Sequence, residues 1–155
     1  MRRVGRIVHQ CRLDERHERG SFVPPTLVEI DRIGRLTKEP FGPVLHVVRY
    51  RGDLLDRAVD EINATGYGLT FGIHSRIDDT IERVTRRIRA GNVYVNRNII
   101  GAVVGSQPFG GEALSGTGFK AGGPHYLLRF CTERTLTVNT AAVGGNLALL
   151  GALRD

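Results

Sequence analysis

The apolar positions of the chain switch between the period of a strand and the period of a helix. Runs rich in β-branched residues, typical of strands, occupy residues 4–10, 23–30, 44–50, 69–75 and 92–96. Two intervening segments, 52–66 and 76–91, repeat their apolar residues every three or four positions and are predicted helices. This succession predicts an α/β fold with a mostly parallel sheet and flanking helices.

The predicted helix at residues 76–91 has the clearest pattern. Its apolar stripe consists of Ile77, Ile81, Val84 and Ile88. Acidic residues fill its first turn and arginines its last, which suits the helix dipole. Gly91 is expected at the C′ position, just past the end of this helix. In the other helix we expect Asp53 to cap the start and Gly66 to lie just past the end.

The rest of the chain shows less regular patterns. Residues 97–124 form a long glycine-rich loop without periodicity, and a loop of this length in a compact domain is usually functional. Residues 124–130 are predicted to form a short helix. Residues 133–140 alternate apolar and polar side chains, which predicts an exposed strand.

Composition narrows the class of protein only modestly. The 155 residues, 41 % of them hydrophobic, suit one domain or a piece of one. The net charge of +6 permits nucleic-acid binding, but the basic residues are scattered and no groove-reading helix is evident, so no nucleic-acid partner is expected. The sequence shows neither a signal peptide nor an apolar run long enough for a transmembrane segment. Two cysteines favour a reduced, cytoplasmic protein.

No complete catalytic or metal site is visible in the residues themselves. Cys11 and Cys131 stand beside no evident base and are expected to be buried structural thiols. His46 and His74 are isolated within strands and are expected to be structural. The stretch from Gly116 to Ala121 matches the pattern G-x-G-x-x-A, but no strand directly precedes it, so we do not expect a phosphate-binding turn.

Two loops carry residues suited to binding. In KEPFGP, prolines fix the backbone around Glu39 and Phe41, a carboxylate and an aromatic ring that can hold ribose hydroxyls and a flat heterocycle. A surface acid beside a core phenylalanine is the alternative. Farther on, Gly101, Ala102 and Gly105 leave backbone N–H groups accessible, and such groups can bind a carboxylate. A tight turn is the alternative there.

Several long motifs resemble one family. KEPFGPV resembles the E-x-FGP motif of aldehyde dehydrogenases, and the segments GYGLTFGIHSRID, AGNVYVN and QPFGGEALSG follow in the family's order and spacing. VPPTLVEI, YVNRNIIGAVVG and KAGGPHYLLRF are similar to one branch in particular. That branch is the L-glutamate γ-semialdehyde (1-pyrroline-5-carboxylate) dehydrogenase module of bifunctional proline-utilisation proteins, the PutA type.

The resemblance implies roles for five residues. Glu39 matches the glutamate that holds the nicotinamide ribose of NAD, and Phe41 matches the aromatic residue near the nicotinamide. Gly101 and Ala102 match the loop whose backbone amides bind the α-carboxylate of glutamate semialdehyde. Phe109 matches the aromatic residue that lines the aliphatic part of this substrate. In the full-length enzyme these groups would serve oxidation of the aldehyde to L-glutamate in proline catabolism.

The family's other functional parts are not found in these 155 residues. The motif of the catalytic cysteine, the general-base glutamate and the Rossmann portion are missing, so we expect no catalytic residue here and no activity of the chain alone. The resemblance divides the chain into a partial catalytic domain, 1–132, and an oligomerisation strand with a tail, 133–155. Expected partners are a second copy or the missing N-terminal part. A non-catalytic assembly or binding module derived from this enzyme is the alternative function.

Overall fold

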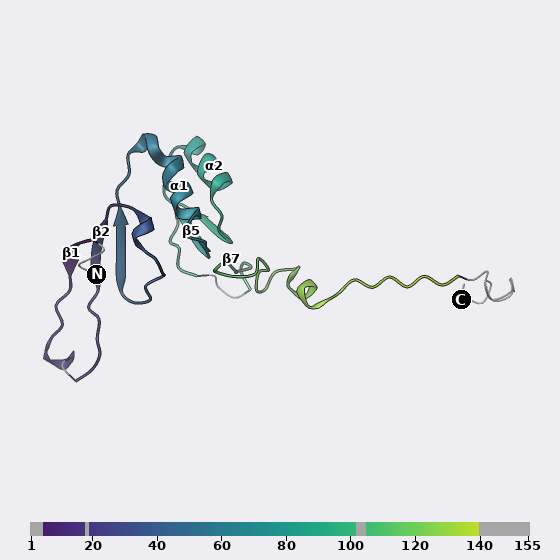
Figure 1. The fold of residues 1–155 in the computed structure, drawn as a ribbon, viewed down its shortest axis with the longest axis horizontal. Coiled ribbons are helices and arrows are strands. Elements are labelled where there is room, and N and C mark those ends of the chain that lie inside the picture. Colours follow the sequence, from purple (N-terminus) through teal and green to yellow (C-terminus); the bar gives the residue numbers. More distant parts are fainter. Residues whose placement is uncertain (1–4, 18, 102–104, 140–155) are drawn as a thin grey trace.

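The computed structural model describes residues 5–17, 19–101 and 105–139, and the α/β class is confirmed (Figure 1). The strands are β1 (Arg6–Gln10), β2 (Thr26–Ile30), β3 (Val44–Val48), β4 (Tyr67–Gly68), β5 (Thr70–Ile73), β6 (Asn92–Val95) and β7 (Glu112–Ala113). The α-helices are α1 (Leu55–Asn63) and α2 (Asp78–Arg87), and the 3₁₀-helices are η1 (Glu15–His17), η2 (Ile33–Arg35), η3 (Gly52–Leu54) and η4 (Tyr126–Phe130). Every strand and helix predicted between residues 4 and 96 is present.

The strands form three small sheets in the described part of the chain, where the sequence predicted one. In the first sheet β2 lies between β1, to which it is antiparallel, and β3, to which it is parallel. The second pairs β5 with β6 in parallel, and the third pairs β4 with β7 in antiparallel fashion. Both parallel pairs arise from single crossover connections, and no described backbone pairing joins one pair to the other.

The hydrophobic core lies between the two helices and the β5–β6 pair. Val59 of α1 and Val84 of α2 are almost completely buried, and Ile88 just after α2 joins them. Figure 1 shows α1 and α2 side by side next to β5. The predicted apolar stripe of α2 is therefore correct in its second half. Its first member, Ile77, precedes the helix and is 63 % exposed.

Two predicted helix caps are wrong. Asp53 lies in η3 and pairs with Arg51 at 2.8 Å, and no side chain caps α1. At the end of α2, Ile88 already adopts an extended conformation, so Gly91 lies beyond the cap. The glycine predicted after α1 is correctly placed, since Gly66 has a positive φ of 76° that favours glycine.

The described part of the C-terminal third contains backbone pairing that the sequence pattern did not reveal. Within the long loop, β7 pairs with β4, and Phe109 forms a bridge with Ala121. The short helix predicted at 124–130 is the 3₁₀-helix η4. The strand predicted at 133–140 is absent from its described part, because residues 133–139 belong to no described strand and lead away from the rest of the chain (Figure 1).

The predicted burial of the two cysteines is also wrong. Cys11 follows the last residue of β1 and Cys131 follows η4, and both are exposed because the elements end just before them. His46 is half-buried on β3 and His74 is exposed after β5. No cluster of potential metal ligands gathers among the described residues. None of the helices in this part of the chain is long and apolar enough to span a bilayer.

Candidate cofactor and substrate site

One cavity brings together two residues that the sequence singled out. This space of about 420 Å³, here called the Glu39 cavity, is lined by Glu39 and Phe41 from the loop before β3. The end of α1, strands β4 and β5, the segment after α2 and residues 114–115 complete its wall. Its lining contains one acid, Glu39, and one base, Arg89, among mainly apolar side chains.

The loop that carries Glu39 and Phe41 is fixed by backbone bonds and ring constraints. Pro40 and Pro43 restrict the chain, and the carbonyl of Pro43 accepts a 2.9 Å bond from the N–H of Thr26 on β2. Phe41 is 92 % exposed, which excludes the alternative that it is a core residue. An exposed ring on a fixed loop, beside an exposed carboxylate, is an arrangement suited to binding.

Phe109 lies in a second cavity. This space of about 310 Å³, the Phe109 cavity, is lined by residues 105–109 together with Ala121 and Gly122. Phe109 is half-buried, and its backbone is tied to Ala121 by two bonds of 3.1 and 2.9 Å. The structure therefore places Phe109 in a different cavity from Glu39.

The long loop contributes to both cavities because it is docked along β4. The N–H of Leu114 donates to the carbonyl of Gly66 at 3.0 Å, and the N–H of Gly68 donates to the hydroxyl of Ser115, also at 3.0 Å. Leu114 and Ser115 line the Glu39 cavity, while Phe109 lines the other. Sequence reasoning missed Ser115 and Arg89, since only their contacts, and no local pattern, distinguish them.

The predicted carboxylate-binding loop is only partly described. Gly101 is exposed and lines neither cavity, and Ala102 lies outside the described residues. Neither Cys11 nor Cys131 lines either cavity. The groups that the structure does gather are thus suited to holding molecules in place.

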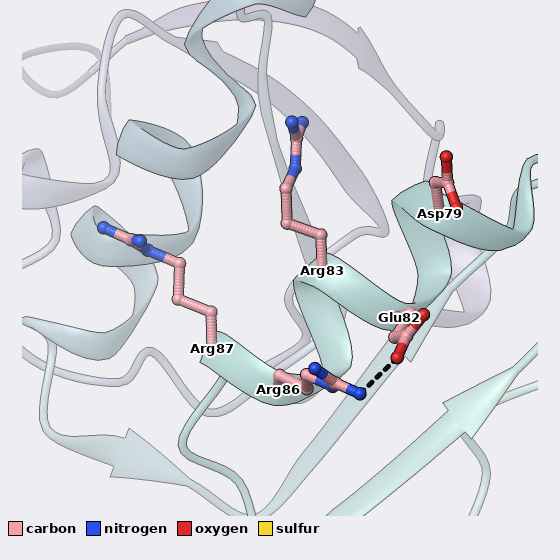
Figure 2. A pocket seen from close by; sticks show the side chains of 5 residues that line it. All are labelled: Asp79, Glu82, Arg83, Arg86 and Arg87. Carbon is pink, nitrogen blue, oxygen red and sulfur yellow. Dashed lines mark ion pairs between the residues drawn. The ribbon is translucent and has the colours of Figure 1, made fainter.

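A shallow hollow on the surface of α2 presents arginines, and Figure 2 shows its lining. Arg86 pairs with Glu82 of the same helix. The other two arginines reach α1: Arg83 pairs with Asp56 at 3.2 Å and Arg87 with Asp60 at 2.5 Å. Each of these arginines therefore has an acidic partner, and the surface is a charge-paired helix end.

Comparison with known proteins gives consistent matches over nearly the whole chain. The sequence model of the aldehyde dehydrogenase family matches residues 2–136. The bifunctional protein PutA of Rhizobium meliloti is 58 % identical over 150 residues, which are 97 % of this chain and 12 % of that protein. The mitochondrial delta-1-pyrroline-5-carboxylate dehydrogenase of Homo sapiens is 41 % identical over 76 % of this chain and 22 % of that protein.

Solved structures agree with these matches. A crystal structure of a Bradyrhizobium japonicum proline utilization A mutant superposes with a TM-score of 0.78 and 57 % identity, covering 91 % of this chain and 14 % of that one. A Thermus 1-pyrroline-5-carboxylate dehydrogenase with bound NAD gives a TM-score of 0.71 and 40 % identity over 83 % of this chain and 25 % of that one. The present chain spans less than a third of each of these relatives. From its motifs, its fold and these matches, the chain belongs to the aldehyde dehydrogenase family.

Proposed function

We propose that this chain supplies the part of an NAD-dependent L-glutamate γ-semialdehyde (1-pyrroline-5-carboxylate) dehydrogenase that positions cofactor and substrate in proline catabolism. The observation that carries the proposal is the meeting of Glu39 and Phe41 in one cavity. Relatives named PutA and 1-pyrroline-5-carboxylate dehydrogenase, up to 58 % identical, support the choice of substrate.

The Glu39 cavity is the proposed site of the nicotinamide end of NAD. A carboxylate accepts strong, charge-assisted bonds from paired ribose hydroxyls, and Glu39 is the acid in this lining. Phe41 offers a freely exposed ring face to a flat heterocycle. The residues present therefore fit the cofactor, which when bound would accept a hydride from the substrate. A relative from Thermus with bound NAD supports this assignment.

The Phe109 cavity is the proposed site of the aldehyde's carbon chain. Its half-buried ring presents an apolar surface to the methylene groups of glutamate semialdehyde. The backbone N–H groups of Gly101 and Ala102 are proposed to bind the α-carboxylate, because successive backbone N–H groups in a glycine-rich loop can attract anions without a cationic side chain.

The proposed contribution of this chain to catalysis is positioning. Oxidation of an aldehyde to an acid through a covalent intermediate needs an activated nucleophile such as a cysteine thiolate. Neither Cys11 nor Cys131 lines the Glu39 cavity or the Phe109 cavity. Holding the reactants in the right geometry accounts for a large part of many enzymatic rate enhancements. Positioning alone does not catalyse the reaction, because the nucleophile must also be present. We therefore expect no NAD reduction by the 155 residues alone.

A segment exchange tests this function. The matching segment of Rhizobium meliloti PutA is replaced by the present chain, with which it shares 58 % identity, and NADH formation from added semialdehyde is measured. We expect kcat/KM of the exchanged enzyme to stay within about tenfold of the parent. Circular dichroism and thermal unfolding report whether the exchanged enzyme is folded. A folded exchanged enzyme without NADH formation, or turnover by the isolated chain, would contradict the proposal.

A further inference from the structure

We infer that Asn92 is a positioning residue for the substrate, which acts by fixing the backbone on both sides of Phe109. The inference rests on the proposed function in one respect, the contact between Phe109 and the substrate. Asn92 itself lies at the start of β6, is 7 % exposed and lines neither cavity. It therefore cannot act by touching the aldehyde and must act through its neighbours.

The side-chain amide of Asn92 makes two bonds that bracket Phe109. Its Nδ2 donates to the carbonyl of Pro108 at 3.3 Å, and its Oδ1 accepts from the N–H of Gly110 at 3.2 Å. Because one partner is an acceptor and the other a donor, the amide has only one productive orientation. Both peptide groups next to Phe109 are thus held by one buried side chain.

Neighbouring contacts reinforce this hold. Gln107 donates from Nε2 to the hydroxyl of Tyr94, which lies two residues after Asn92 on the same face of β6 and is 7 % exposed. Lys120 donates from Nζ to the carbonyl of Gly110 at 2.5 Å. Residues 107–110 are consequently fixed at several points, and the ring of Phe109 has little freedom to move away from its cavity.

A role in packing alone does not explain an asparagine at this position. Burying an amide is unfavourable unless its donor and acceptor are both satisfied, and an apolar residue would fill the same volume at lower cost. Both hydrogen bonds of the Asn92 side chain are made to the peptide groups that flank Phe109. A displacement of about 1 Å in a substrate-contacting group is enough to lower catalytic efficiency strongly.

Asn92→Leu in the exchanged PutA tests the inference, since leucine keeps the approximate volume and removes both bonds. We expect KM for the semialdehyde to rise about tenfold, with kcat changed less and KM for NAD unchanged. Phe109→Ala should raise the same KM. If Asn92 acts through Phe109, the double variant is no worse than Phe109→Ala alone, whereas independent effects would multiply.

Asn63 provides a matched control. Its side chain makes an equivalent pair of bonds, donating to the carbonyl of Arg87 at 2.9 Å and accepting from the N–H of Arg89 at 2.8 Å, but these peptides do not flank Phe109. Asn63→Leu is expected to lower the Tm and to leave KM for the semialdehyde unchanged. Asn92→Asp keeps the bond from Gly110 and loses the bond to Pro108, so its KM for the semialdehyde should lie between those of the parent and Asn92→Leu. This variant replaces Asn92→Leu in the test if Asn92→Leu does not fold.

The outcomes separate the two proposals. If Phe109→Ala leaves KM for the semialdehyde unchanged, the proposed substrate contact is wrong. If Phe109→Ala raises KM but Asn92→Leu and Asn92→Asp do not, the positioning role of Asn92 is overturned. It is equally overturned if the effects of Asn92→Leu and Phe109→Ala multiply in the double variant, or if Asn63→Leu raises the same KM to the same extent.

Discussion

At the scale of single residues, Gly91 serves close packing between the segment after α2 and the long loop. A Cβ atom at this position would overlap the carbonyl oxygen of Gly110 and the Nζ of Lys120. We expect Gly91→Ala to lower the free energy of unfolding by about 1–3 kcal/mol, the usual effect of overpacking. Urea unfolding followed by circular dichroism measures the change.

Gly34→Ala is the matched control, because a Cβ at Gly34 would meet no atom within 4 Å. Its unfolding free energy should stay within about 0.5 kcal/mol of the original chain. Equal destabilisation by both alanine substitutions would show that the close approach at Gly91 has no energetic consequence.

The site residues differ in how well a sequence can reveal them. Glu39 and Phe41 stand out locally, because a carboxylate, an aromatic ring and two prolines lie within six residues. Asn92 has no such signal. Its partners are backbone groups 16 and 18 positions away, and every residue has such groups, so only the folded loop shows which ones it meets. The local pattern likewise predicts Gly91 at the helix end, because its close neighbours, Gly110 and Lys120, belong to a distant loop that the pattern does not reveal.

At the scale of elements, an ion pair links α1 to α2. Arg87 donates to the carboxylate of Asp60 from Nε at 2.7 Å and from Nη2 at 2.5 Å. These bonds hold the pKa of Asp60 below its ordinary value. The unfolded chain therefore takes up this proton at a higher pH than the folded chain does. The stabilisation is complete above about pH 5 and is lost as the pH falls through about 4 toward the lowered pKa.

Removing either partner should flatten this pH dependence. We expect Arg87→Gln and Asp60→Asn to lose less stability than the original chain when the pH falls from neutral to about 3. Urea unfolding at several pH values and low salt is the measurement, since salt screens an exposed pair. Stability curves that run parallel for all three proteins would show that the pair does not couple the helices.

The elements predicted best are those whose pattern is local. The two helices are predicted from apolar residues that share one helix face, and Val59 and Val84 from these faces are buried in the core. Strands β2 and β6 follow from β-branched runs. The strand predicted at 133–140 is absent from its described part because an alternating pattern cannot supply a partner backbone. Leu136 and Val138 remain 78 % and 67 % exposed, and the role of this segment in oligomerisation stays a prediction.

At the scale of the whole molecule, the described chain buries few apolar side chains and exposes many. Its helical core centres on Val59, Val84 and Ile88, while large apolar residues such as Phe41, Ile100 and Phe130 are mostly exposed. The sequence predicted one sheet, and the described part of the structure has three. The reason is the one that hid the contacts of the long loop: which distant strands pair cannot be read from the pattern of any one segment.

The central claim is that one chain holds a cofactor site at Glu39 and a separate substrate site at Phe109. The most direct measurement is the pair of KM values, for NAD and for the semialdehyde, in the exchanged PutA carrying Glu39→Ala or Phe109→Ala. The account predicts a crossed pattern, in which Glu39→Ala raises mainly KM for NAD and Phe109→Ala raises mainly KM for the semialdehyde, each by about tenfold or more. Two variants that raise both values equally, or neither, would contradict it.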